Sequence, residues 1–356
     1  MTRAETELIV TYSLQNENSK VLSKSQFIDE IMASYHIEEE AAKVDENTIA
    51  EFYYNLLKKE DRVIPLIEKE LIDKWLDSYS LSVTHLNKYL KCPISFYFEA
   101  ILKVPHARNA YSGFGTAMHG ALHHFFLNIN KTGEAPLENL QFHFQENMKA
   151  FRSNFTEKEY ESFMTHGLRT LKALHAHKIK EWSQGQKFAV EEKLENAEYK
   201  GIPIKGFIDK IEIYDDYVHV VDYKTGDPTK PKTKAKLKEP SERDPNGGDY
   251  WRQIVFYKIL LDSDKKENYN MVTGEVDFIE PDKKNGEFSN SKYAVQPEEM
   301  DIVGAQIVET VANIKDYKFD TTCDDEECMW CNFVKDNYTI NAELKEDIYE
   351  LSLIHI

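Results

Sequence analysis

Hydrophobic residues recur at three- and four-residue spacing through most of the first half of the chain, and this period predicts amphipathic helices. Ser82 stands where an N-cap is needed before the pattern "SVTHLNKYLKCP", and Pro93 predicts the end of that helix. The residues "KTG" predict the end of a longer helix. A strand within residues 1–20 is expected ahead of these segments. The predicted helical segments are residues 24–78 (two or three helices), 82–92, 114–130 and 136–182.

The period changes in the second half, where short alternating or uniformly apolar runs predict strands. In chain order we expect strands at 187–195, 202–215 and 217–224, a helix at 249–262, a strand at 269–281 and a helix at about 297–315. Helices, then consecutive strands, then alternating helix and strand are typical of an α/β protein. The pattern therefore predicts helices packed on a small mixed sheet, preceded by an N-terminal helical segment.

The chain has 356 residues and 41% hydrophobic content, enough for one sizeable core plus an appendage, or for two domains. It has no apolar run of about 18 residues and no leader pattern, so we expect a cytoplasmic protein with no membrane partner. The net charge of −18 argues mildly against a general nucleic-acid binder. Residues 224–238, however, hold six lysines and a single acid, Asp227, which predicts a concentrated basic loop directly after a strand.

Both ends of the sequence are expected to be truncated. The opening "MTRAETELIVTYS" resembles the last conserved motif of UvrD-like superfamily 1 helicases, in which an arginine, here Arg3, reaches the nucleotide γ-phosphate. The sequence holds no G-x-x-x-x-G-K-[ST] phosphate loop, so the motor itself is expected to be missing. The last residues, 351–356, "LSLIHI", read as a translated sequencing adapter and are left out of the fold prediction.

Four weak signals follow one another in the rest of the chain. His119 lies in the predicted helix as "FGTAMHGAL", and Asp209 ends a predicted strand as "GFID". Asp222 and Lys224 lie in "VVDYKTG", where the two-residue period of a strand places them on one face. A pair of this kind is most often an exposed ion pair, and a helical histidine is most often part of a core. The fourth signal is "QIVFY", which places Gln253 and Tyr257 on one helix face.

Taken together and in this order, the signals resemble the RecB-like branch of the PD-(D/E)XK nuclease superfamily. The resemblance spans about residues 80–335 and includes "SVTHLNKYLKCP", which is similar to the entry motif of that branch. It implies a restriction-endonuclease-like fold and a Mg²⁺- or Mn²⁺-dependent deoxyribonuclease, most simply an exonuclease. The implied domains are a helicase remnant with connecting helices at 1–79 and a nuclease domain at 80–345. The implied partners are DNA, as single strands or duplex ends, and a helicase motor domain or subunit.

Phosphodiester hydrolysis explains why these residue types are needed. A hard cation held by carboxylate oxygens brings an anionic ester and a water together. Asp209 and Asp222 are the expected carboxylate ligands, and a nitrogen from His119 would admit Mn²⁺ alongside Mg²⁺. We expect Lys224 to stay protonated and stabilise negative charge, since a base role requires its pKa to fall by about 3 units. Gln253 and Tyr257 are expected to position the lysine and the DNA backbone.

Two further groups carry predicted functions. One early and three late cysteines resemble the iron–sulfur staple of part of this nuclease branch, a cluster that ties the two ends of the domain together. The resemblance implies a [4Fe-4S] cluster. The expected last cysteine is missing near Asn337, so zinc or four ordinary thiols remain alternatives. The basic loop is predicted to meet DNA phosphates. The cysteines are Cys92, Cys323, Cys328 and Cys331, and the lysines are Lys230, Lys232, Lys234, Lys236 and Lys238.

The predicted function is DNA cleavage by a helicase–nuclease in end processing, recombination or repair. One alternative is a catalytically silent DNA-binding or scaffold module with the same fold. A second is a metal-dependent hydrolase with another substrate, against which the basic loop favours a polyphosphate backbone. RNA stays open as a substrate because no residue was identified that reads a 2′-hydroxyl.

Overall fold

The computed structural model describes residues 26–35, 45, 47–48, 50, 69–105, 109–264, 266, 269–282, 285–323 and 325–337. The predicted strand within 1–20, the helicase-like arginine Arg3 and the adapter-like residues 351–356 lie outside this set. The chain forms two compact units, residues 1–61 and 62–356. In the first unit the structure describes helix α1 (Gln26–Tyr35). No helix in the described residues is long and apolar enough to cross a membrane.

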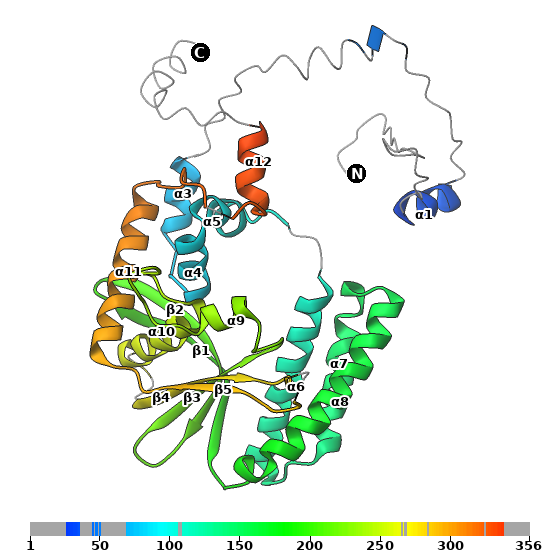
Figure 1. The fold of residues 1–356 in the computed structure, drawn as a ribbon, viewed down its shortest axis with the longest axis vertical. Coiled ribbons are helices and arrows are strands. Elements are labelled where there is room, and N and C mark those ends of the chain that lie inside the picture. The colour runs from blue at the N-terminus through cyan, green and yellow to red at the C-terminus, as the bar shows by residue number, and fades with distance from the viewer. Residues whose placement is uncertain are drawn as a thin grey trace. The chain divides into compact units, whose positions relative to one another are not determined.

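The second unit is built on a five-stranded mixed sheet in the order β1-β2-β3-β4-β5 (Figure 1). The first three strands are antiparallel neighbours, β3 and β4 are parallel, and β4 and β5 are antiparallel. A parallel step needs a crossover, and helix α10 lies within it. The strands are β1 (Lys187–Tyr199), β2 (Ile202–Ile213), β3 (Val218–Lys224), β4 (Met271–Phe278) and β5 (Asn290–Tyr293).

Helices cover both faces of this sheet (Figure 1). Helices α4, α10 and α11 share one hydrophobic core with it, and α6, α7 and α8 share another. The predicted α/β class with a restriction-endonuclease-like mixed sheet is confirmed. The bounds are α4 (Val83–Lys91), α6 (Ala110–Thr132), α7 (Leu137–Ala150), α8 (Glu157–Trp182), α10 (Asp249–Ser263) and α11 (Pro297–Lys315).

Strand β3 shows how the two cores position the chemistry. Val218 and Val220 enter the core under α10, whereas Val221 and Tyr223 enter the core under α6. Side chains along a strand alternate between faces, so Asp222 shares the α10 face with the first two valines. This strand is buried on both sides, so its polar residues His219 and Asp222 are buried together with its valines.

Short helices complete the unit. Aromatic residues of α3, α5 and the adjoining π-helix pack around Phe319, and α12 packs on α5. The predicted helical segment before residue 80 is thus partly described, through α1 and α3. The short elements are α3 (Lys69–Leu76), α5 (Pro93–Phe96), a π-helical turn (Tyr97–Ile101), a 3₁₀ turn (Arg152–Asn154), α9 (Pro231–Lys236) and α12 (Met329–Asn337).

Local signals in the sequence placed several element ends correctly. The Ser82 side chain accepts the backbone N–H of His85 and caps α4, as predicted. Gly133, the glycine of "KTG", ends α6 with a left-handed φ of 73°, a conformation that glycine adopts without strain. Pro93 does not only stop α4: it is the first residue of α5, where its missing N–H costs nothing.

Two expectations were wrong, and one strand was missed. The lysine-rich segment is not a plain loop, because Pro231 starts the short helix α9 within it. Asp209 does not end a strand, since β2 continues to Ile213. Strand β5 was not predicted: four polar or half-buried residues, "NSKY", carry no apolar run, and their pairing with β4 creates the strand.

Candidate active site

A pocket of about 460 Å³ opens where β2, β3, α6 and α10 meet the first turn of α4. It gathers residues from six elements, since Lys193 and Glu195 of β1 also line it. The structure therefore brings together every residue that the sequence analysis assigned to catalysis or to the divalent metal. These lining residues are His119, Asp209, Asp222, Lys224, Gln253 and Tyr257.

Asp209 is held where β2 and β3 separate. The last backbone pair between these strands is Lys210 with Val221, and beyond it the Asp209 Oδ2 accepts the backbone N–H of Tyr223 at 2.9 Å. Its Oδ1 lies 3.2 Å from Nδ1 of His119 on α6. Burial acts to raise the pKa of Asp209, but the charge and hydrogen bond of His119 outweigh it and hold that pKa below its ordinary value.

Asp222 and Lys224 form the centre of the pocket. The Oδ2 of Asp222 lies 2.5 Å from Nζ of Lys224, and both residues face α10 as the strand period predicted. Burial raises the pKa of Asp222, and the charge of Asp209 adds to this. Burial alone would lower the pKa of Lys224, but the ion pair with Asp222 outweighs it and raises that pKa. The lysine is therefore protonated at neutral pH.

Gln253 and Tyr257 connect α10 to this ion pair. The Gln253 Oε1 accepts from Nζ of Lys224 at 3.0 Å, and its Nε2 donates to Oδ1 of Asp222 at 2.8 Å. The Tyr257 hydroxyl lies 2.9 Å from the carbonyl oxygen of Phe207 and 3.1 Å from Oδ1 of Asp222. The amide orients acid and lysine together, and the tyrosine fixes β2 relative to β3.

The donor set fits a hard divalent cation. The Oδ2 of Asp222 is buried and accepts no hydrogen bond of good geometry, although the Nζ of Lys224 lies beside it. Two carboxylates and an imidazole that line one pocket are ligands suited to Mg²⁺ or Mn²⁺. A cation bound here would be held by His119, Asp209 and Asp222 and would supply positive charge beside the pocket.

The structure also brings the four cysteines together. The Sγ of Cys92 lies 3.5 Å from that of Cys331 and 4.0 Å from that of Cys328, and Cys323 lies 3.7 Å from Cys331. All four are free thiols whose sulfurs lie within 4.8 Å of one another. Burial opposes ionisation of Cys328, but hydrogen bonds from Ser95 and the neighbouring cysteines lower its pKa to about 6. Such a set could bind a metal ion or a cluster.

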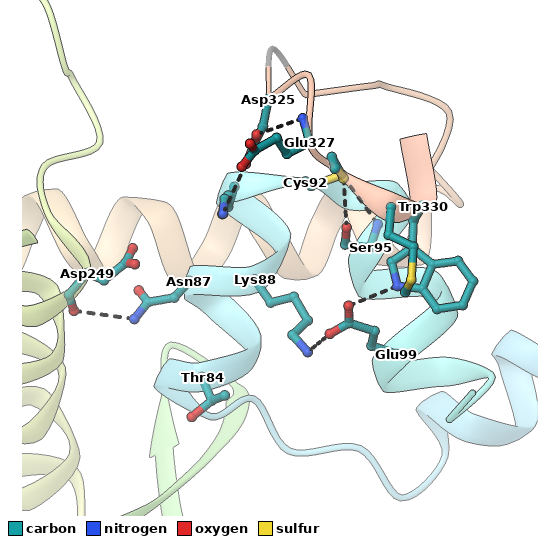
Figure 2. Close-up of a pocket in the computed structure, with 13 residues that line it drawn as sticks. Thr84, Asn87, Lys88, Cys92, Ser95, Glu99, Asp249, Asp325, Glu327 and Trp330 are labelled. Atoms are coloured by element: carbon teal, nitrogen blue, oxygen red, sulfur yellow. Dashed lines mark hydrogen bonds and ion pairs between the residues drawn. The ribbon is translucent and has the colours of Figure 1, made fainter. Parts of the chain in front are cut away.

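A second pocket, of about 400 Å³, lies beside these cysteines (Figure 2). Trp330 donates its Nε1–H to Glu99 at 2.9 Å, and Lys88 pairs with the same carboxylate. The Trp330 ring also stacks on Phe98, with ring centroids 4.4 Å apart. These contacts attach α12 to the helices that follow Cys92. Side-chain packing therefore holds the late cysteines close to Cys92, in addition to the contacts between the sulfur atoms.

The predicted DNA-binding lysines do not line the active-site pocket. Four of the five are exposed, on and beside α9, and with the described residues they form no ion pair. Lys236 and Lys224 both lie over the ring of Tyr250, at 5.0 and 4.9 Å from its centroid. The basic segment is therefore adjacent to Lys224, without entering its pocket. Lys193 and Lys205 line the pocket instead.

Sequence reasoning missed Arg252, which precedes Gln253 on α10. Its guanidinium is buried, and all five of its N–H groups find acceptors. These acceptors lie on α4, on α11, on α10 itself and in the loop before α10. An arginine in an amphipathic pattern gives no sign of this role, because only the packed helices supply the acceptors. They are the side chains of Asn87, Gln306 and Asp249 and the carbonyl groups of Asn246 and Gly247.

A mixed sheet between helices, with an Asp–Lys pair and a second aspartate facing one pocket, defines a nuclease-like fold of the restriction-endonuclease class. The family model of the PD-(D/E)XK nuclease superfamily matches residues 80–335. The chain belongs to this superfamily. Its members are nucleases that use divalent metals, and the fold implies DNA as the substrate.

Other comparisons add little. No curated protein matches the sequence significantly. One solved structure, described as the crystal structure of SSO0001, is similar over 82% of this chain and 98% of its own. Its sequence identity is 16% and its TM-score is 0.31, which is too low to support a detailed structural likeness.

Proposed function

We propose that the chain is a Mg²⁺- or Mn²⁺-dependent deoxyribonuclease of the RecB-like branch, acting in DNA end processing, recombination or repair. One observation carries the proposal. The amide of Gln253 bridges Lys224 and Asp222 in a pocket that Asp209 and His119 also line. An exposed ion pair, the ordinary alternative for a D-x-K sequence, would have neither the burial nor the bridging amide.

In this proposal His119, Asp209 and Asp222 hold the cation, which supplies charge stabilisation and a more acidic water when bound. Lys224 stays protonated and places its ammonium group where negative charge grows on the phosphoryl oxygens. Gln253 keeps that ammonium group in place, because its Oε1 accepts one of the three N–H groups. Tyr257 holds the two strands at the spacing that the ligands need.

The wider assignment rests on the sequence motifs. We propose that residues 80–345 form the nuclease domain and that residues 1–79 are a remnant and connection to a helicase motor, carried by another part of the protein or by a partner subunit. The preferred substrates are single-stranded DNA or duplex ends, and exonuclease action is the simplest mode for an enzyme that works behind a motor.

The test is cleavage of end-labelled oligonucleotides by the purified chain. We expect cleavage of single- or double-stranded DNA with Mg²⁺ or Mn²⁺, its loss on addition of a chelator, and its return when the metal is restored. Product ladders from 5′- and 3′-labelled strands separate exonuclease from endonuclease action. Tight DNA binding without cleavage under all these conditions would favour the scaffold alternative, and equal cleavage of RNA would remove the restriction to DNA.

We expect the lysines of the α9 segment to meet phosphates and not bases. Replacing Lys232 and Lys234 by Gln should weaken binding evenly across sequences. Each lost phosphate contact should reduce the slope of log K against log salt by about 0.7–0.9. The matched control replaces Lys158 and Lys172, exposed lysines of α8, and should leave the slope unchanged. Equal slopes for both double variants would mean that α9 points away from DNA.

We propose that the four cysteines hold a [4Fe-4S] cluster, with zinc as the alternative. Anaerobically purified protein should be brown and contain iron. Each kcal/mol of folding stability that is lost with the metal lowers the melting temperature of a unit of this size by roughly 2 °C. Cys92→Ser should therefore melt like wild-type protein stripped of its metal. Stoichiometric zinc would keep the staple and discard the cluster, and metal-free protein with unchanged melting of Cys92→Ser would discard both.

A further inference from the structure

Phe207 is a large apolar side chain exposed at the mouth of the active-site pocket. Its relative exposure is 55%, although residues 206 and 208 on either side of it pack on α10. It lies two residues before Asp209 on β2, and it lines the same pocket. An isolated exposed aromatic residue elsewhere would need no explanation. Here it lies within one strand repeat of a proposed metal ligand.

The backbone around Phe207 is tightly held. Its carbonyl oxygen lies 2.9 Å from the Tyr257 hydroxyl, and the same hydroxyl lies 3.1 Å from Asp222. Gly206 packs so closely on α10 that an added Cβ would lie 2.6 Å from the Leu260 side chain. The ring of Phe207 is thus carried by a strand whose position relative to Asp222 is fixed. A residue that recognises a ligand needs such a rigid support.

Two lysines lie close to Phe207 along the sheet. Lys193 is its register partner across β1, and Lys205 lies two residues earlier on β2; both line the pocket. Lys193 pairs with Glu195 at 2.6 Å, but both side chains are about half exposed, so this ion pair is weak and a phosphate can compete for the lysine. An aromatic face beside lysines is the arrangement with which proteins bind unpaired nucleotides: bases stack on the ring and phosphates meet the cations.

We propose that Phe207 is a stacking subsite for one unpaired nucleobase, that of a nucleotide adjoining the phosphodiester that is cut. The inference rests on the proposed function, because it takes the pocket to hold nucleic acid. A protein partner is a poor alternative occupant of this surface. An apolar docking patch needs several contiguous apolar side chains, whereas Phe207 has lysines beside it. A base that stacks on Phe207 cannot remain stacked in a duplex, so the substrate must be unpaired at this nucleotide.

The test measures binding of a fluorescent single-stranded oligonucleotide by anisotropy with Ca²⁺ present, and separately KM and kcat with Mg²⁺. Phe207→Ala should raise Kd roughly 5- to 150-fold, the range for one lost base stack. It should also raise KM by more than it lowers kcat. Phe207→Tyr should bind like wild type, whereas Phe207→Leu, apolar but not aromatic, should not. Phe142→Ala is the matched control: Phe142 is 56% exposed, lies on α7 and does not line the pocket.

Abasic substitutions identify the base. An oligonucleotide with one abasic nucleotide, moved stepwise past the cleavage site, should bind wild type weakly at one position. Phe207→Ala should show no further loss at that position, because base and ring act as one pair. Additive losses, or Phe207→Leu that binds like Phe207→Tyr, would overturn the subsite. Protein that binds in this Phe207-dependent way without cleaving would refute the nuclease proposal alone, and absence of any DNA binding would refute both.

Discussion

Replacing Asp222 by Asn is expected to abolish DNA cleavage while the protein stays folded. The amide is nearly isosteric with the carboxylate, and its Oδ1 still accepts from Gln253 and Tyr257. It has no negative charge with which to hold a cation. Metal ions contribute several kcal/mol of charge stabilisation to phosphoryl chemistry, and each 1.36 kcal/mol is a factor of ten in rate. A rate loss of about 10³-fold or more should follow.

Single-turnover cleavage with DNA and Mg²⁺ both saturating measures this effect. Circular dichroism and thermal melting establish that the variant is folded. Metal should raise the melting temperature of wild type and not that of Asp222→Asn. Asp216→Asn is the control, because Asp216 is exposed in the turn between β2 and β3, away from the pocket. Undiminished cleavage by Asp222→Asn would remove Asp222 from the metal site.

Lys224→Ala is expected to slow cleavage by roughly 10²–10³, the cost of losing one preorganised donor of transition-state stabilisation. Lys224→Arg should recover part of this rate, since it keeps the charge but cannot reproduce the contact with Gln253. Metal binding should persist in both variants. A fall in metal affinity that accounts for the whole rate loss would mean that Lys224 only supports Asp222.

The pH dependence separates the two roles of the lysine. The pKa of Lys224 in the folded protein is raised above its ordinary value of 10.5. The stability contributed by its ion pair is therefore fully present below that value, and it is lost as pH rises through the raised pKa. A charge role predicts a rate that Lys224 does not modulate between pH 6 and 9. An acid limb near neutrality that disappears in Lys224→Arg would show that the lysine acts as a base.

Local patterns in the sequence determined much of the site. The period of two along β3 placed Asp222 and Lys224 on one face, and the helical period placed Gln253 and Tyr257 on another. The Ser82 cap likewise follows from an oxygen acceptor before an apolar helical pattern. These features depend on residues a few positions apart, so backbone geometry alone fixes them once the element type is known. The resemblance to a nuclease family then predicted that these residues share one site.

Only the tertiary structure decided how these elements meet. Asp209 points into the pocket because β2 and β3 separate there and leave the N–H of Tyr223 for its carboxylate. Arg252 is buried because α4 and α11 surround it with acceptors, whereas Phe207 lines the pocket and is exposed. Burial and orientation depend on contacts between distant segments, such as Asn87 and Arg252, which lie 165 residues apart. The sequence by itself predicted which side chains would carry the chemistry, and long-range packing brings those side chains to one pocket.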